Sequence, residues 1–231
     1  MSTPFPLGRI AEFDERSRAF AWTPPVGTGA TPKRPVSVAH RVFGRRLNQR
    51  RIGGCTGFAL TGARNCHPNH VGGERAFGDE TGRKVYALAT TLDGIPGAWV
   101  DDGSDLGSGQ DTGSSGLAAC KAGVQLGMIT RYEWCFGVDH MVDATVDHPV
   151  IVGTDWTEDM FNPEPHGLVR PTGNVVGGHE WVVRGRHLKH RLFYAVNSWG
   201  REWGLNGEFL ISFDDMATLL RRGGDVKVPI R

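Results

Sequence analysis

The chain has 231 residues, a formal net charge of +1 at pH 7 and 39% hydrophobic residues, which is typical of a globular protein. It contains no run of about 18 apolar residues and no basic segment followed by an apolar run. We therefore expect no membrane span, no signal peptide and a cytoplasmic location. The balanced charge also argues against nucleic acid as a partner.

Residues 1–47 are expected to form an extended N-terminal arm, because runs such as Thr23-Pro24-Pro25 and Thr31-Pro32 disfavour regular structure. Two lobes of one domain should follow. The pattern predicts a helical lobe over residues 48–135 and a β-rich lobe over residues 136–231. The 33 glycines and 13 prolines favour a loop-rich fold over a helical bundle.

Cys55 is placed at the start of the first expected helix. Gly53 and Gly54 allow a tight turn before it, and the apolar residues from Phe58 to Ala63 follow with helical spacing. A free thiol, with a pKa of about 8.5, is mostly protonated at neutral pH, and the first turn of a helix stabilises the thiolate. Cys55 is therefore the candidate nucleophile.

Two further helices are predicted in the first half of the chain. Residues 81–92 show helical spacing of apolar side chains and are followed by Gly94, and residues 115–126 begin at serines and stop at Gly127. Their apolar faces are interpreted as core.

The other three cysteines, Cys66, Cys120 and Cys135, are odd in number and cannot all pair within the chain, which favours a reducing compartment. Cys66 and His70 are four residues apart and could share a metal ion, but no further ligand has a recognisable spacing. We expect neither a metal nor a cofactor.

The second half predicts short strands over residues 150–154, 181–184, 192–196, 208–212 and 226–230. His179 precedes the second strand, and Asn197 follows the third within Asn197-Ser198-Trp199-Gly200. The imidazole would take the proton of the Cys55 thiol, Asn197 would orient the ring, and Trp199 would shield their hydrogen bond. A helical lobe carrying the Cys and a stranded lobe carrying the His would form opposite walls of a cleft.

In the order Gln49, Cys55, His179 and Asn197, the sequence resembles the papain-like cysteine peptidases, of the bacterial or phage type without a long propeptide. The resemblance implies an α+β fold of two lobes, with the active site in the cleft between them. It assigns Gln49 and the backbone N–H of Cys55 to the oxyanion hole. It also places Gly113, Ser114, Gly178 and Trp199 at the substrate, which would be a peptide or protein.

Three positions depart from the family pattern. Ile52 and Thr56 replace a cysteine and an aromatic residue, which removes a disulfide and one wall of the cleft. Glu180 replaces a small apolar residue after the His. Its side chain should point away from the catalytic face of the strand and meet a basic partner.

Charge is unevenly distributed, with ten Lys and Arg against three acids in residues 1–52 and eight acids against one Arg in residues 135–180. These regions either attract each other or are simply solvated. A more specific hypothesis is that arginines around Gln49, including Arg50 and Arg51, select acidic substrates.

The predicted function is a cysteine-type peptidase that forms a thioester. The alternatives are a hydrolase of peptidoglycan stem peptides or amides and a catalytically silent module of a larger assembly.

Overall fold

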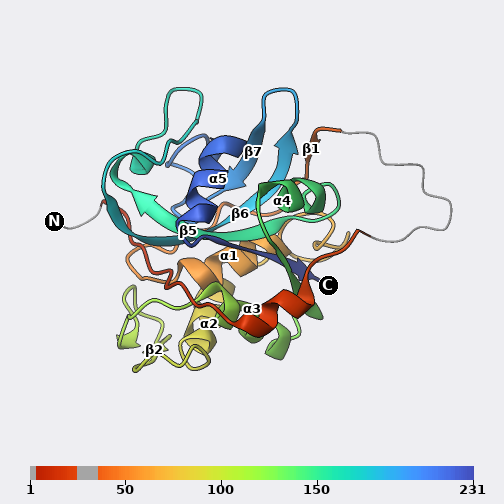
Figure 1. The fold of residues 1–231 in the computed structure, drawn as a ribbon. Helices are drawn as coiled ribbons and strands as arrows, with labels where there is room; N and C mark the ends of the chain where they lie inside the picture. The colour runs from red at the N-terminus through yellow and green to blue at the C-terminus, as the bar shows by residue number, and fades with distance from the viewer. Residues whose placement is uncertain (1–3, 25–35) are drawn as a thin grey trace.

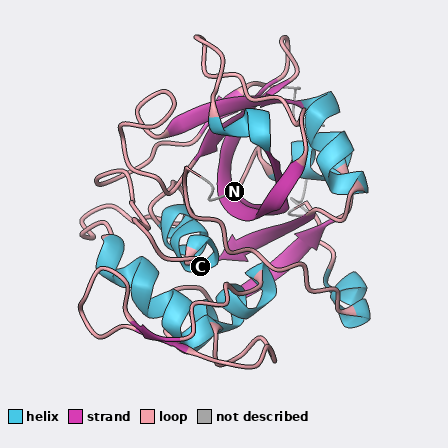
Figure 2. Ribbon diagram, turned by 90° about the vertical axis from the view of Figure 1, so that its left-hand side faces the viewer, coloured by secondary structure: helices cyan, strands magenta, loops and turns pink. Residues whose placement is uncertain are grey.

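The computed structural model describes residues 4–24 and 36–231, and its elements form a helical group and a large sheet (Figure 1). Figure 2 shows one set of helices lying apart from the curved strands. The prolines of the arm at positions 25, 32 and 35 lie outside the described residues. None of the helices in the described part of the chain is long and apolar enough to cross a bilayer.

The helical group contains the three helices expected from the sequence. They are α1 (Cys55–Arg64), α2 (Asp79–Ala89) and α3 (Gly116–Gln125), together with a small ribbon of β2 (Trp99–Val100) and β3 (Ser108–Gly109). Every residue of α1 is buried, because α2, α3 and the sheet surround it. A Cβ on Gly57 of α1 would lie 2.5 Å from the carbonyl oxygen of Gly82 in α2. Glycine is thus required where the two helices touch.

The sheet has seven strands, all paired antiparallel, in the order β4-β9-β5-β6-β7-β8, with β1 added to β6. Its strands are β1 (Val38–Ala39), β4 (Arg131–Cys135), β5 (Val150–Thr157), β6 (Val175–His187), β7 (Leu192–Val196), β8 (Glu208–Ser212) and β9 (Asp225–Ile230). The five predicted strands are confirmed, and β6 extends well beyond the predicted range 181–184.

Strands β1 and β4 were not predicted, and neither were three helical elements on the sheet side: α4 (Val138–Ala144), η2 (Glu158–Phe161) and α5 (Phe213–Arg221). Helices α4 and α5 pack together on the face of the sheet opposite α1, where the larger hydrophobic core lies. The second core joins the other face to α1–α3. Because both faces are covered, β5 buries almost every residue.

The N-terminal arm is not extended throughout. It contains the 3-10 helix η1 (Glu15–Phe20), and β1 fixes its later part to the sheet. In Figure 1 the red N-terminal segment crosses the front of the molecule before it reaches η1. This path takes it over the start of α1.

Candidate active site

Cys55 is the first residue of α1, and Gly54 occupies the preceding cap position without a side-chain hydrogen bond. The free N–H groups of this turn face the region of the thiol, where they favour negative charge. The side chain is completely buried. The predicted placement of Cys55 at a helix start is confirmed, but solvent does not reach it in this structure.

His179 lies on β6, and its Nε2 is 2.7 Å from Oδ1 of Asn197, which follows β7. The backbone N–H of Ser198 donates to the same oxygen at 2.7 Å, so this oxygen accepts and Nε2 carries the hydrogen. Nδ1 is buried and takes part in no hydrogen bond. The arrangement leaves the lone pair of Nδ1 available for a proton.

Two tryptophans enclose the imidazole. Trp199 stacks on the His179 ring with centroids 4.5 Å apart, and Trp156 meets it edge-on at 4.9 Å. Trp203 and Phe209 extend this aromatic cluster beneath the strands. The predicted shielding role of Trp199 thus agrees with its position over the ring.

Gln49 is tied to the same loop as Asn197. Its Oε1 accepts from the Ser198 hydroxyl at 2.5 Å, and its backbone N–H donates to the Ser198 carbonyl at 2.8 Å. Its Nε2 donates to the carbonyl of Ile52 at 2.9 Å and that of Pro6 at 3.3 Å. Ser198, which was not among the predicted site residues, therefore links Gln49 to Asn197.

Residues 4–10 of the arm occupy the cleft. The N–H groups of Gly8 and Arg9 donate to the Gly178 carbonyl at 3.1 and 3.0 Å, and the Ser114 N–H donates to the Gly8 carbonyl at 2.8 Å. Phe5 stacks on Trp199 with centroids 4.8 Å apart.

The four positions expected to bind substrate therefore surround the arm. Ser114 and Gly178 are hydrogen bonded to the arm, and Trp199 stacks on Phe5. Gly113 also touches the arm, because a Cβ there would lie 2.2 Å from the Gly8 carbonyl oxygen. Their role in binding substrate stays a prediction. Residues 4–10 therefore cover Cys55.

Comparison with solved structures gives the same architecture. Xylellain, a cysteine protease from Xylella fastidiosa, has a TM-score of 0.70 and 18% identity over 97% of this chain and 95% of that one. The digestive procathepsin L2 proteinase of Tenebrio molitor has a TM-score of 0.61 and 16% identity over 99% and 81%. For bromelain from Ananas comosus in complex with the inhibitor E64, the values are 0.50 and 15% over 82% and 94%.

The chain has the papain-like cysteine protease fold. Neither protein-family models nor curated proteins give a match. The two-lobe α+β architecture expected from the motifs is therefore confirmed by structure alone, at low sequence identity.

In the covered cleft of this papain-like fold, burial favours the uncharged forms of Cys55 and His179. Burial raises the pKa of Cys55 to about 12, and the negative charge of Glu180 acts in the same direction, while backbone hydrogen bonds from Glu180 and Gly8 partly oppose it. Burial lowers the pKa of His179 to about 4, against the hydrogen bond with Asn197. The expected thiolate–imidazolium pair is thus disfavoured while the arm excludes water.

Glu180 meets a basic partner, as expected, but it does not point away from the candidate nucleophile, because its charge acts on the Cys55 thiol. Its side chain is fully buried and forms an ion pair with Lys227 of β9. Asp225 and Arg9 lie in the same group, and neither was singled out from the sequence. No local pattern marks the contact of Arg9 with Asp225, because the two residues lie 216 positions apart.

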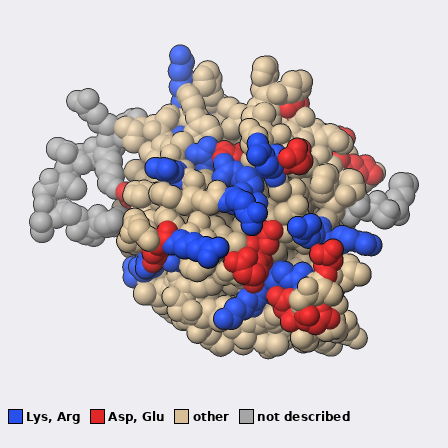
Figure 3. Space-filling model, turned by 180° about the vertical axis from the view of Figure 1, so that it is seen from behind, with Lys and Arg blue, Asp and Glu red and all other residues tan. Residues whose placement is uncertain are grey.

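The predicted arginine cluster is divided between two environments. Arg46 is bound to Glu208 and donates to the Asn206 carbonyl, whereas Arg50 and Arg51 line the surface beside Phe5 and Trp199. In the rear view of Figure 3, basic and acidic side chains are interspersed. Neither sign of charge therefore dominates that face.

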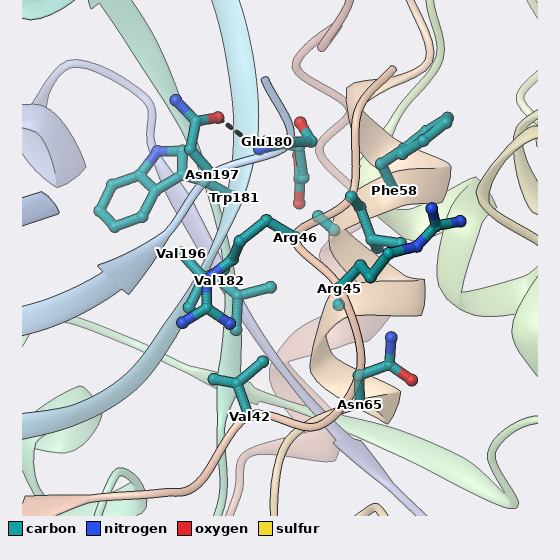
Figure 4. A pocket seen from close by; sticks show the side chains of 14 residues that line it. Val42, Arg45, Arg46, Phe58, Asn65, Glu180, Trp181, Val182, Val196 and Asn197 are labelled. Carbon is teal, nitrogen blue, oxygen red and sulfur yellow. Dashed lines mark hydrogen bonds between the residues drawn. The ribbon is translucent and has the colours of Figure 1, made fainter. Parts of the chain in front are cut away.

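The seam between α1 and the sheet is too small for substrate. Figure 4 shows Val182 and Val196 on the strands across from the helix that carries Phe58, whose ring points away from them, with the side chains of Arg45 and Arg46 between. The cavity measures about 20 Å³, which is room for about one water molecule.

No group of three or more metal-ligating side chains gathers among the described residues. Cys66 donates to the Gly62 carbonyl at 3.3 Å, and His70 stacks on Phe43 with centroids 4.1 Å apart. Both residues of the candidate metal pair therefore have structural contacts.

Proposed function

We propose that the protein is a cysteine peptidase that hydrolyses peptide bonds through a thioester on Cys55. The observation that carries this proposal is the polypeptide already present in the cleft. Residues 4–10 cross Cys55 and are bound through their backbone by Gly178 and Ser114. A cleft that binds a peptide backbone beside a thiol and an oriented imidazole has the parts required for acyl transfer.

The first half of the reaction forms the acyl-enzyme. Nδ1 of His179 accepts the thiol proton, and the sulfur attacks the carbonyl carbon of the scissile bond. The negative charge on the carbonyl oxygen is stabilised by the Cys55 N–H and Nε2 of Gln49. The carbon–nitrogen bond then breaks, and His179 returns its proton to the departing amine.

The second half releases the acid. A water molecule gives a proton to Nδ1 of His179 and attacks the thioester carbonyl carbon. The carbon–sulfur bond breaks, the carboxylic acid leaves, and Cys55 recovers its proton from the imidazolium. Asn197 holds the ring in the required tautomer throughout. Both halves need residues 4–10 to leave the cleft first.

The arm explains why the neutral state of Cys55 does not contradict this proposal. Solvent must enter when residues 4–10 leave, and the burial that raises the thiol pKa then decreases. The pKa of His179 should rise for the same reason. The pair can then exchange a proton near neutral pH.

The test is hydrolysis of a fluorogenic peptide library and of purified peptidoglycan by the full chain, compared with Cys55→Ala. Cys135→Ala is the matched control, because it also removes a buried thiol but lies on β4. We expect turnover of peptides by the wild type and Cys135→Ala, and none by Cys55→Ala. Equal activity in all three proteins would overturn the proposal, and turnover of peptidoglycan alone would favour the cell-wall alternative.

A further inference from the structure

A buried group of four charged side chains lies beside the nucleophile. It consists of Arg9 from the arm, Glu180 from β6, and Asp225 and Lys227 from β9. Glu180 directly follows His179, and its backbone N–H is hydrogen bonded to the Cys55 thiol. The group therefore forms a side pocket of the cleft at the catalytic centre.

Arg9 is the member of the group that comes from the arm. Its guanidinium donates to Asp225 Oδ2 at 3.1 Å and to the Gly223 carbonyl at 2.9 Å, and its side chain is 3% exposed. Its Nε is 3.9 Å from Glu180 Oε2. An arginine of a peptide lying in the cleft thus has its cationic end in an anionic pocket.

The charges balance only when Arg9 is present. Lys227 is bound to Oε1 of Glu180 and Oδ1 of Asp225, which leaves the second oxygen of each carboxylate to other partners. Oε2 of Glu180 is buried and accepts no hydrogen bond. Without Arg9 the pocket holds two carboxylates and one ammonium, and a buried net negative charge is costly.

Two glycines make room for the group. A Cβ on Gly153 of β5 would lie 2.5 Å from Glu180 Oε2, 2.6 Å from Arg9 Nε and 2.7 Å from Asp225 Oδ1. A Cβ on Gly116 of α3 would lie 2.2 Å from Glu180 Oε1. The space is therefore just large enough for a guanidinium on a flexible stem, and any side chain at Gly153 would close it.

We propose that this pocket, defined by Glu180, Asp225 and the Gly223 carbonyl, is a specificity site for an arginine side chain of the peptide substrate. Arg9 occupies it while the arm covers the cleft, and a substrate arginine replaces Arg9 when the arm leaves. This inference rests on the proposed peptidase function. It predicts that the substrate carries a basic residue near the scissile bond. The hypothesis of acidic substrates concerns a different part of the cleft, because exposed Arg50 and Arg51 lie beside Phe5 of the arm.

The first experiment measures binding without turnover, using the full chain with Cys55→Ala and Arg9→Ala. The probes are Nα-acetyl-arginine amide and Nα-acetyl-citrulline amide, which have similar shape but differ in charge. We expect the arginine compound to raise the melting temperature and the citrulline compound to have no effect. Equal effects of the two compounds would overturn the pocket.

The second experiment measures hydrolysis by the Arg9→Ala protein with Cys55 intact. Peptide pairs carry arginine or citrulline at each position in turn. We expect kcat/KM to favour arginine at one position by on the order of 10- to 100-fold, as for a buried charged hydrogen bond. Adding Asp225→Asn should remove most of this preference, and adding Asp214→Asn, an exposed carboxylate on α5, should not.

The two readouts separate the two proposals. Hydrolysis without any preference for arginine would refute the pocket and leave the peptidase function intact. Selective binding of the arginine amide without hydrolysis of any peptide would refute the peptidase function and support the pocket.

Discussion

Gly8 is the point at which the arm lies closest to the catalytic lobe. A Cβ at this position would be 1.9 Å from the carbonyl oxygen of Gly53 and 2.5 Å from its carbonyl carbon. Both atoms belong to the backbone just before α1, so no side-chain rotation can relieve the contact. We predict that Gly8→Ala expels residues 4–10 from the cleft while the rest of the fold is retained.

The expected size of the effect follows from what must be broken. Moving Gly8 disrupts its hydrogen bonds with Gly178 and Ser114, which contribute about 1 kcal/mol each. The overpacking adds about 1–3 kcal/mol. The covered state should therefore lose about 3–5 kcal/mol relative to the open state. The open population should rise by about 100- to 4,000-fold where it is small in the wild type.

The assay is alkylation by iodoacetamide at pH 7, followed by mass spectrometry of each cysteine. Cys55 should react about 100 to 4,000 times faster in Gly8→Ala than in the wild type. Cys66, Cys120 and Cys135 are also buried, so their protection reports that the fold is intact. Gly72→Ala is the matched control, because a Cβ there meets no atom within 4 Å.

Two results would refute the reasoning. If Cys55 reacted at the same rate in Gly8→Ala and Gly72→Ala, the arm would not control access to the thiol. If all four cysteines became reactive together in Gly8→Ala, the substitution would unfold the protein rather than open the cleft.

Three further predictions concern the catalytic groups. In the Gly8→Ala background, Gln49→Ala should lower kcat by about 10²–10³ with little change in KM, and an unchanged kcat would remove Gln49 from the oxyanion hole. Asn197→Ala should retain more activity than His179→Ala in the same assay, because it removes orientation rather than the proton acceptor. Burial lowers the pKa of His179 to about 4, so the unfolded chain, with a pKa of about 6.5, binds the proton first as pH falls. The wild type should therefore lose roughly 3 kcal/mol of stability between pH 6.5 and 4 relative to His179→Gln, measured by urea unfolding, and parallel pH profiles would contradict this.

Helices and strands were predicted correctly where the local sequence pattern matches the position of the element in the fold. The strands at Leu192–Val196 and Glu208–Ser212 begin and end where expected. β6 was predicted too short, because Gly177 and Gly178 weaken the strand pattern although both pair with β5. α5 was missed although Ser212 caps it through the Asp215 N–H, a signal that was present in the sequence.

The residues of the candidate site also divide into those marked by a local motif and those brought together only by the fold. Cys55, His179 and Asn197 could be found because each stands in a short motif of glycine or tryptophan. The arm and the pocket could not, because Arg9 becomes meaningful only when the fold brings it to Asp225. Nothing in the sequence near Arg9 distinguishes it from the other arginines of the first fifty residues.

The pairing of β1 with β6 has a consequence for how the cleft opens. Val38 and Ala39 are hydrogen bonded to the sheet, and the backbone N–H of Trp22 donates to the Trp134 carbonyl at 2.8 Å. When residues 4–10 leave the cleft, they therefore remain attached to the molecule that they covered. Opening and closing are unimolecular, so dilution cannot release the arm. A substrate competes with a ligand whose local concentration is set by the length of the chain between the cleft and its anchors.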